Sequence, residues 1–385
     1  MTKHLKTLGL VGALLGFSFL ASASAATPML DTIPVKTSSA DEFTPVSEGP
    51  WFSWTQVNHA HPNHADVFVR RGSGHPIKVN EPGRNGDGGG IYGDTLVYSE
   101  WKGNWAGNIR MFNLRTHRRS SFPSKVSTRY DEYHPTISGP WVLFTRYIDT
   151  SRTTMVLLYN TQTRELRTLD TDSGTHRWVY SGQVNGDYAT WGRVTPSGQD
   201  VYLYRISTGT STTAPRTSFA QYNPSVTSDG TLYYGRSGNS CGGAVSLVRY
   251  VPGGVATVLH SFHTGIDVGY SYVDERTNGS LQVFFGQFNC RHKRSDIYKA
   301  IDSYSVSVSK AGSGAGTVTS SPAGIDCGTA CQSVFHGGAT VAFTANPGSG
   351  SVFSGWSDAS CGTNPTCAID VESGVSLTAT FDAAP

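Results

Sequence analysis

The chain has 385 residues, which is enough for two or three average domains or for one large all-β domain with a small one. Lys and Arg number 30 against 28 Asp and Glu, and because Lys3 and Lys6 fall in the export signal described next, the mature chain carries 28 of each. This balance argues against a strongly basic, polyanion-binding protein, so no nucleic-acid partner is expected.

The N-terminus has the pattern of a secretory signal. The basic stretch MTKHLK precedes the apolar run LGLVGALLGFSFL, which is too short to span a bilayer, and the small residues 23–25 provide a cleavage site. We predict a cleaved signal peptide over residues 1–25. No later stretch is apolar enough for a transmembrane segment, so the mature protein is expected to be secreted or at the cell surface, with the periplasm as an alternative.

A hexapeptide pattern recurs six times, with starts 43 to 51 residues apart. Its fourth position is always aromatic, its fifth is Thr, Ser or Gly, and its sixth is Gln, Glu or Arg. A glycine one to three residues before each copy allows a tight turn, which makes each copy the second strand of a hairpin. The copies are WFSWTQ from Trp51, TLVYSE from Thr95, WVLFTR from Trp141, YATWGR from Tyr188, TLYYGR from Thr231 and QVFFGQ from Gln282.

The remainder of each repeat completes a small antiparallel sheet. A polar loop and a third strand follow each hexapeptide, and no amphipathic helical stretch separates the repeats. Four short strands per repeat predict an all-β fold, a six-bladed β-propeller over residues 26–302. The last repeat lacks a fourth strand, and residues 31–36 have no other partner. We therefore expect this segment to close the ring as the outer strand of blade six.

The composition changes at about Ser303. Short alternating strands with Gly-Ser turns predict a second, small β-domain over residues 303–385. This tail has one base, Lys310, against five acids, which leaves 27 bases against 23 acids in the propeller.

All six cysteines follow the predicted signal, and an even number in an exported chain favours disulfides over metal or redox sites. Cys241 and Cys290 each follow a hexapeptide, in adjacent blades and at similar offsets, so we expect them to pair. In the tail, the short spacings predict a small domain pinned by the local pairs Cys327–Cys331 and Cys361–Cys367.

Two families resemble parts of the chain. The propeller resembles the TolB-type six-bladed family over roughly residues 31–302, in a Pro-x-[IV]-Ser first strand at residues 135–138 and a D-[IV]-Y third strand at residues 296–298. The tail resembles the bacterial InlB B-like (divergent) repeat over residues 304–382, which implies an exported surface or adhesion-associated module, usually non-catalytic. That match lies in Gly314-x-Gly316-x-Val318, Pro322-x-Gly324-Ile325-x-Cys327-Gly328, Cys331, Phe353-x-Gly355-Trp356-Ser357, Cys361, Cys367 and Leu377-Thr378-Ala379-x-Phe381.

In a propeller, the loops after the second strands and the starts of the first strands share the face around the mouth of the central channel. We expect the sixth hexapeptide residue of each blade to point toward this face, with aromatic side chains beside it. Such a surface suits stacking on sugar rings and bidentate binding of carboxylates, whereas the alternative is that the arginines form inter-blade ion pairs and the aromatics pack the blades. The predicted ligand-binding residues are Trp101, Trp105, Tyr133, His134, Arg146, Trp178, Arg193, Tyr222, Arg236 and Tyr270.

The first mouth loop, VNHAHPNHADV, contains His59, His61, His64 and Asp66, which are close enough in sequence to share a metal. A solvated polar loop is the default interpretation, because the loop contains Pro62 and offers no fixed scaffold. We therefore expect no metal and no other cofactor.

These observations predict an exported binding or adhesion-type protein whose propeller presents a face to an extracellular or cell-surface glycan or protein. The alternative is a propeller-fold polysaccharide lyase or another carbohydrate-active enzyme, in which Tyr133, His134 and Arg146 would act as base, acid and charge neutraliser. No spacing singles out a catalytic set, so the first interpretation is preferred. The pattern identifies neither the ligand nor the oligomeric state.

Overall fold

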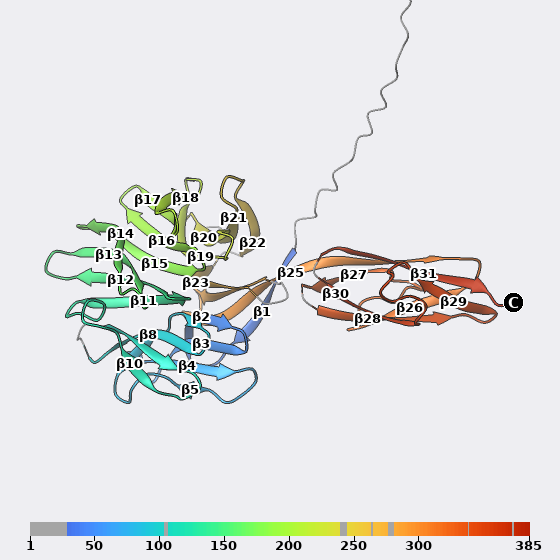
Figure 1. Ribbon diagram of the computed structural model, residues 1–385, viewed down its shortest axis with the longest axis horizontal. Coiled ribbons are helices and arrows are strands. Elements are labelled where there is room, and N and C mark those ends of the chain that lie inside the picture. Colours follow the sequence, from blue (N-terminus) through green and yellow to red (C-terminus); the bar gives the residue numbers. More distant parts are fainter. Residues whose placement is uncertain are drawn as a thin grey trace, which may run out of the picture.

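The computed structural model describes residues 29–103, 107–238, 245–262, 265–275, 281–337, 339–371 and 373–385. Its first part is a ring of six four-stranded antiparallel blades, and its second part is a β-sandwich joined to the ring by one long strand (Figure 1). Both parts of the predicted fold class are confirmed. Among the described residues, no helix is long and apolar enough to cross a membrane.

Each predicted hexapeptide forms the second strand of a blade. Blades one and two contain β2 (Asp41–Glu48), β3 (Trp51–Val57), β4 (Ala65–Arg71) and β5 (Ile77–Lys78), then β6 (Asn85–Asp87) with β7 (Ile91–Tyr92), β8 (Thr95–Trp101), β9 (Asn108–Asn113) and β10 (Arg119–Ser121). Blades three and four contain β11 (Asp131–Ser138), β12 (Trp141–Ile148), β13 (Thr153–Asn160) and β14 (Leu166–Ser173), then β15 (Trp178–Asn185), β16 (Tyr188–Thr195), β17 (Gly198–Arg205) and β18 (Thr210–Thr213).

Blade five contains β19 (Ala220–Val226), β20 (Leu232–Ser237), β21 (Val245–Tyr250) and β22 (Thr257–Phe262), and blade six contains β23 (Ile266–Glu275), β24 (Leu281–Asn289) and β25 (Arg294–Ala311). The fourth strand of blade six is β1 (Met29–Lys36), which pairs antiparallel with β25 from Met29↔Ser303 onward. The predicted closure of the ring by the N-terminal segment is therefore confirmed, and it covers what would otherwise be an exposed edge.

The core lies between the blades. The aromatic residues at position four of the hexapeptides are all buried there, which explains why this position repeats most strictly. Each first strand except that of blade two contains one β-bulge, and in blades one, three and five the bulge carries a residue with positive φ directly before proline, at Thr44, His134 and Asn223. Glycines take the corresponding places in the bulges of blades four and six, and in blade two glycines separate β6 from β7.

The side chain of Gln183 links three blades through backbone hydrogen bonds. Gln183 of β15 donates from Nε2 to the carbonyl of Val273 at 3.0 Å and accepts the backbone N–H groups of Val226 and Val273 at 3.2 Å each. It thereby joins blade four to blades five and six.

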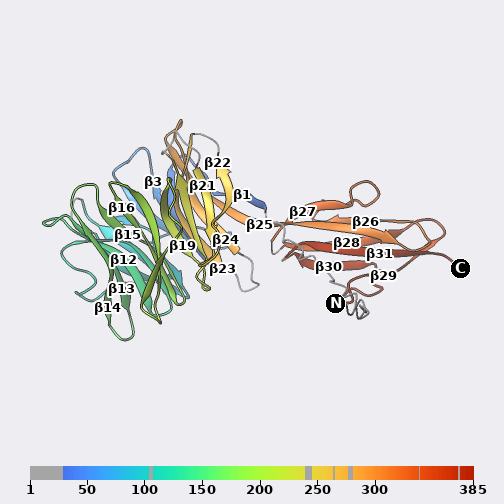
Figure 2. The same ribbon diagram turned by 90° about the horizontal axis from the view of Figure 1, so that it is seen from above.

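The strand β25 runs out of blade six into the second domain (Figures 1 and 2). Its pairing with β1 ends at Ser303, where pairing with β27 (Gln332–His336) begins, and β31 (Val375–Ala383) joins in parallel from Val306. β29 (Ser351–Trp356) completes this sheet, and β26 (Gly316–Ser321), β28 (Ala339–Pro347) and β30 (Thr366–Val371) form the second one. A common core joins the two sheets of the tail.

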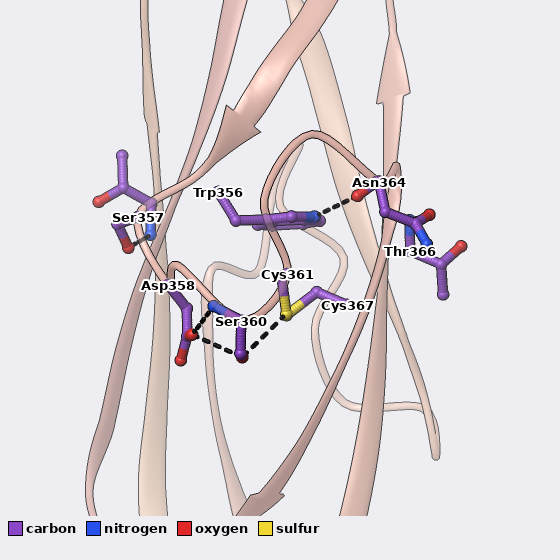
Figure 3. Close-up of a disulfide and its surroundings, with 9 residues drawn as sticks. Trp356, Ser357, Asp358, Ser360, Cys361, Asn364, Thr366 and Cys367 are labelled. Carbon is purple, nitrogen blue, oxygen red and sulfur yellow. Dashed lines mark hydrogen bonds between the residues drawn. A yellow bond between two sulfur atoms is a disulfide. The ribbon is translucent and has the colours of Figure 1, made fainter.

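The two predicted disulfides of the tail are confirmed. Cys327 pairs with Cys331 and Cys361 with Cys367. Figure 3 shows the second bridge beside Trp356, whose indole N–H donates to the carbonyl of Asn364 at 2.8 Å. The expected partner pair Cys241–Cys290 falls partly outside the described residues, because Cys241 is not among them; Cys290 is disulfide-bonded.

Candidate functional site

The mouth of the propeller contains a cavity with two lobes. The first lobe, over blades two to four, has a volume of about 790 Å³, and the second, over blades four to six, about 630 Å³. Tyr133, His134 and Trp178 line both lobes, so the two adjoin at these residues. The Trp178 side chain is 40% exposed at this junction. The cavity is large enough for a drug-sized ligand or a short chain of sugar units.

The residues that line the mouth come from two strand positions. Tyr133, Tyr180 and Tyr222 lie on first strands opposite position five of the hexapeptide. Trp178 and Asp267 lie on first strands opposite the residue that follows the hexapeptide. Because successive side chains of a strand point to opposite faces, these two positions share one face and the position between them takes the other.

This alternation explains where the sixth-position arginines lie. Arg146 donates from Nε to the buried carboxylate of Glu132 at 2.9 Å and from Nη2 to two loop carbonyls. Arg193 forms ion pairs with Asp170 and Asp172 of the preceding blade. Arg193 thus has the inter-blade partners that the packing alternative expects, whereas Arg146 is paired within its own blade. Neither arginine lines the cavity.

Arg236 also lies outside the lining of both lobes, with its guanidinium 5.5 Å from the ring centroid of Phe219. The expected cluster of three arginines around the channel therefore does not form the wall of the cavity. The one-residue offset along each strand is the physical reason.

The other predicted residues fall into two groups. Trp101, Tyr133, His134, Trp178 and Tyr222 line the cavity. Trp105 and the side chain of Tyr270 lie outside the described residues. Sequence reasoning missed the acids Asp87, Asp131 and Asp267 and the cations Arg152 and Arg177, which also line it. A usable signal was present for two of them, because Asp131 and Asp267 occupy the same register near the start of a first strand.

The floor of the first lobe is a polar cluster around Asp87. Its Oδ1 accepts the hydroxyls of Thr44 and Thr55 at 2.7 Å each, and its Oδ2 lies 3.6 Å from Nε2 of His134. Burial lowers the pKa of His134, although Asp87 opposes this shift. The imidazole is therefore neutral at neutral pH.

Tyrosine hydroxyls form the wall of both lobes. Burial, followed by the charge of Asp131, raises the pKa of Tyr133 to about 12, and burial raises that of Tyr180 to about 12. Tyr222 donates its hydroxyl to Asp267 at 3.2 Å. All three phenols consequently stay protonated and act as hydrogen-bond donors or acceptors rather than as bases.

Two hexapeptide glycines make room for these rings. A Cβ atom at Gly192 would lie 2.2 Å from the ring of Tyr180, and one at Gly235 would lie 2.5 Å from the ring of Tyr222. Blades one to three have Thr or Ser at the same position. The residue at position five thus decides whether a tyrosine can lie flat against the second strand.

The histidine loop does not bring its ligands together. His64 Nε2 lies 3.0 Å from Asp66, whereas His59 faces Asp41 at 3.8 Å. Against the effect of burial, hydrogen bonds from Lys78 and Asn80 lower the pKa of Asp66. Across the described part of the chain, no group of three or more His, Cys, Asp or Glu residues could hold a metal ion.

The family comparison concerns the tail. Residues 304–385 match the Divergent InlB B-repeat domain, as their cysteine and glycine pattern predicted. No curated protein matches the chain.

Solved structures resemble the propeller. TolB from Acinetobacter baumannii is 12% identical, with a TM-score of 0.45 over 65% of this chain and 63% of its own. The β-propeller domain of the Trilobed protease from Pyrococcus furiosus is 9% identical, with a TM-score of 0.41 over 69% of this chain and 94% of its own. A prolyl oligopeptidase B from Galerina marginata is 13% identical, with a TM-score of 0.41 over 71% of this chain and 41% of its own. The chain thus spans less than two thirds of TolB and of the oligopeptidase.

The protein is therefore a six-bladed β-propeller followed by a domain that matches the Divergent InlB B-repeat domain. Its disulfides and its repeat domain indicate a location outside the cytoplasm.

Proposed function

We propose that this is an exported glycan-binding protein, which holds a carbohydrate chain across the mouth of its propeller while the repeat domain belongs to the cell surface or the extracellular space. The observation that carries the proposal is Trp178, a half-exposed indole that lines both lobes of the cavity. An aromatic face flanked by hydrogen-bonding groups suits a sugar ring, whose apolar face stacks while its hydroxyls bond to the walls.

The polar groups around Trp178 support a carbohydrate. Asp131 keeps one carboxylate oxygen in the lobe while the other accepts the N–H of Gly107 at 2.7 Å. Protonated phenols such as Tyr133 add donors. A concave cavity of this volume also favours a chain-like small ligand over a protein surface, which would need a flatter and larger contact.

Binding is measured first with the full mature chain on a glycan array and then by calorimetry with the retained glycan. We expect Trp178→Ala to weaken binding tenfold or more, because the loss of a stacked aromatic anchor costs about 2 kcal/mol. The matched control is Tyr92→Ala, since Tyr92 is 48% exposed and borders the small cavity at the opposite end of the channel. Retention that is unaffected by Trp178→Ala would overturn the proposal.

The lyase alternative is tested with the same protein on polysaccharide panels. Its expected trio does not meet in the cavity, because Arg146 is bound to Glu132 and does not line either lobe, and Tyr133 remains protonated. We therefore expect retention without release of unsaturated uronides. Detection of such products would favour the enzyme.

A further inference from the structure

The charged groups of the mouth are unevenly paired. Asp87 and Asp131 line the first lobe and Asp267 lines the second. Within the described residues, no Lys or Arg lies within ion-pair distance of any of these three carboxylates. Among the residues that the structure describes, the donors to Asp267 are neutral: the Tyr222 hydroxyl at 3.2 Å and the backbone N–H of Val268 at 2.9 Å.

The cations of the mouth do not balance these acids. Arg177 is held by Asp172 at 3.0 Å, and Asp172 also takes Arg193 at 2.7 Å. Arg152 is the one cation lining the first lobe that lacks an ion pair within the described residues, and the described lining of the second lobe contains no Lys or Arg. Three carboxylates thus face one guanidinium, in a propeller whose overall composition is 27 bases against 23 acids.

The aromatic walls of the mouth also favour a positively charged ligand. Trp178 and Tyr133 line both lobes, and the face of an aromatic ring attracts cations. A concave site lined by one sign of charge raises the local concentration of ligands of the opposite sign. An ammonium group in the mouth would meet carboxylates and ring faces, whereas a carboxylate there would meet mainly like charge.

We propose that the mouth selects amino-sugar chains that carry free ammonium groups, and that it discriminates against uronate chains. This inference rests on the proposed glycan binding and specifies its ligand class. It reverses the expectation from the sequence, in which three arginines would recognise an anionic glycan.

The test compares three chains of equal length by calorimetry with the full mature protein at mildly acidic pH, where free amino groups are protonated. They are a chitosan oligosaccharide, its fully N-acetylated counterpart and an oligogalacturonate. The first two have the same backbone and differ in the ammonium group alone. We expect the chitosan chain to bind about tenfold or more tightly than the acetylated chain and the oligogalacturonate to bind weakest, with the difference shrinking as salt is added.

Variants that change the charge of the mouth test whether its carboxylates cause the preference for the chitosan chain. Asp267→Asn should lower the affinity for the chitosan chain about three- to fivefold, and more than it lowers that for the acetylated chain, whereas Arg152→Gln should raise it. Asp326→Asn is the control, because it removes one exposed acid of the tail and leaves the mouth intact. Binding of the acetylated or uronate chain at least as tightly as chitosan overturns this inference and leaves glycan binding standing. Failure of all three chains to bind also overturns this inference, while the array and the Trp178→Ala variant decide glycan binding itself.

Discussion

Neighbouring blades approach each other closely at the channel, so an alanine substitution should cost much more stability at one of two equivalent glycines than at the other. Gly182 lies in the bulge of blade four and Gly269 in that of blade six. A Cβ atom at Gly182 would lie 2.3 Å from the carbonyl oxygen of Pro224 in the next blade and 2.5 Å from the hydroxyl of Thr190. At Gly269 the nearest atom would be 3.5 Å away, which is an ordinary contact.

Alanine at position 182 therefore forces the backbone of blade five to move by about an ångström, which is overpacking of the kind that costs about 3 kcal/mol. Neither glycine has a positive φ, so backbone strain does not contribute to the difference. We expect Gly182→Ala to lower Tm by about 6–12 °C in a domain of this size, and Gly269→Ala to change it by a few degrees at most.

Thermal and denaturant unfolding followed by circular dichroism would measure both variants. Equal losses of stability in the two would refute the reasoning, because they would show that the steric distance to Pro224 does not decide the cost. A third variant, Gly89→Ala, should behave like Gly182→Ala, since its Cβ would lie 2.3 Å from the carbonyl oxygen of Pro135.

Three further predictions concern single interactions. Lys36→Met should cost about 2–3 kcal/mol of stability, because it leaves the fully buried Glu42 without its cation; Lys36 Nζ lies 3.2 Å from Glu42 Oε1 and ties β1 to blade one. Adding Glu42→Gln to this variant should recover most of the loss in a double-mutant cycle. Burial lowers the pKa of His134, so the unfolded chain binds a proton at this residue more readily than the folded chain does. The free energy of unfolding should therefore fall as the pH drops below about 6.5, and this fall should be smaller in His134→Asn. Trp356→Phe should lower the stability of the tail by about 1 kcal/mol through loss of the bond to Asn364.

The fold could be predicted because its signals are local and repeated. The hexapeptide carries strand alternation, a buried aromatic residue and a turn glycine in six copies, and the unpartnered segment before blade one had a single place left in the ring. The aromatic part of the site could be predicted for the same reason, since Tyr133 and Trp178 start first strands on the mouth face. The directions of the charged side chains could not be predicted. The cavity-facing acids and the packed arginines differ by one position along a strand, and a sequence does not show which face of each strand the neighbouring blade covers.

The bulges of the first strands connect the stability of the ring with the shape of its mouth. At His134 the bulge places the imidazole in the floor of both lobes, and the proline after it lies against Gly89 of the preceding blade. The cavity-lining Tyr133 and Trp178 lie on the same paired strands rather than on loops, so closed blade packing fixes their positions in advance of any binding. A variant that loosens the bulge contacts, such as Gly182→Ala, should therefore weaken glycan binding as well as stability, whereas Lys36→Met, whose ion pair joins β1 to blade one outside the cavity, should reduce stability alone.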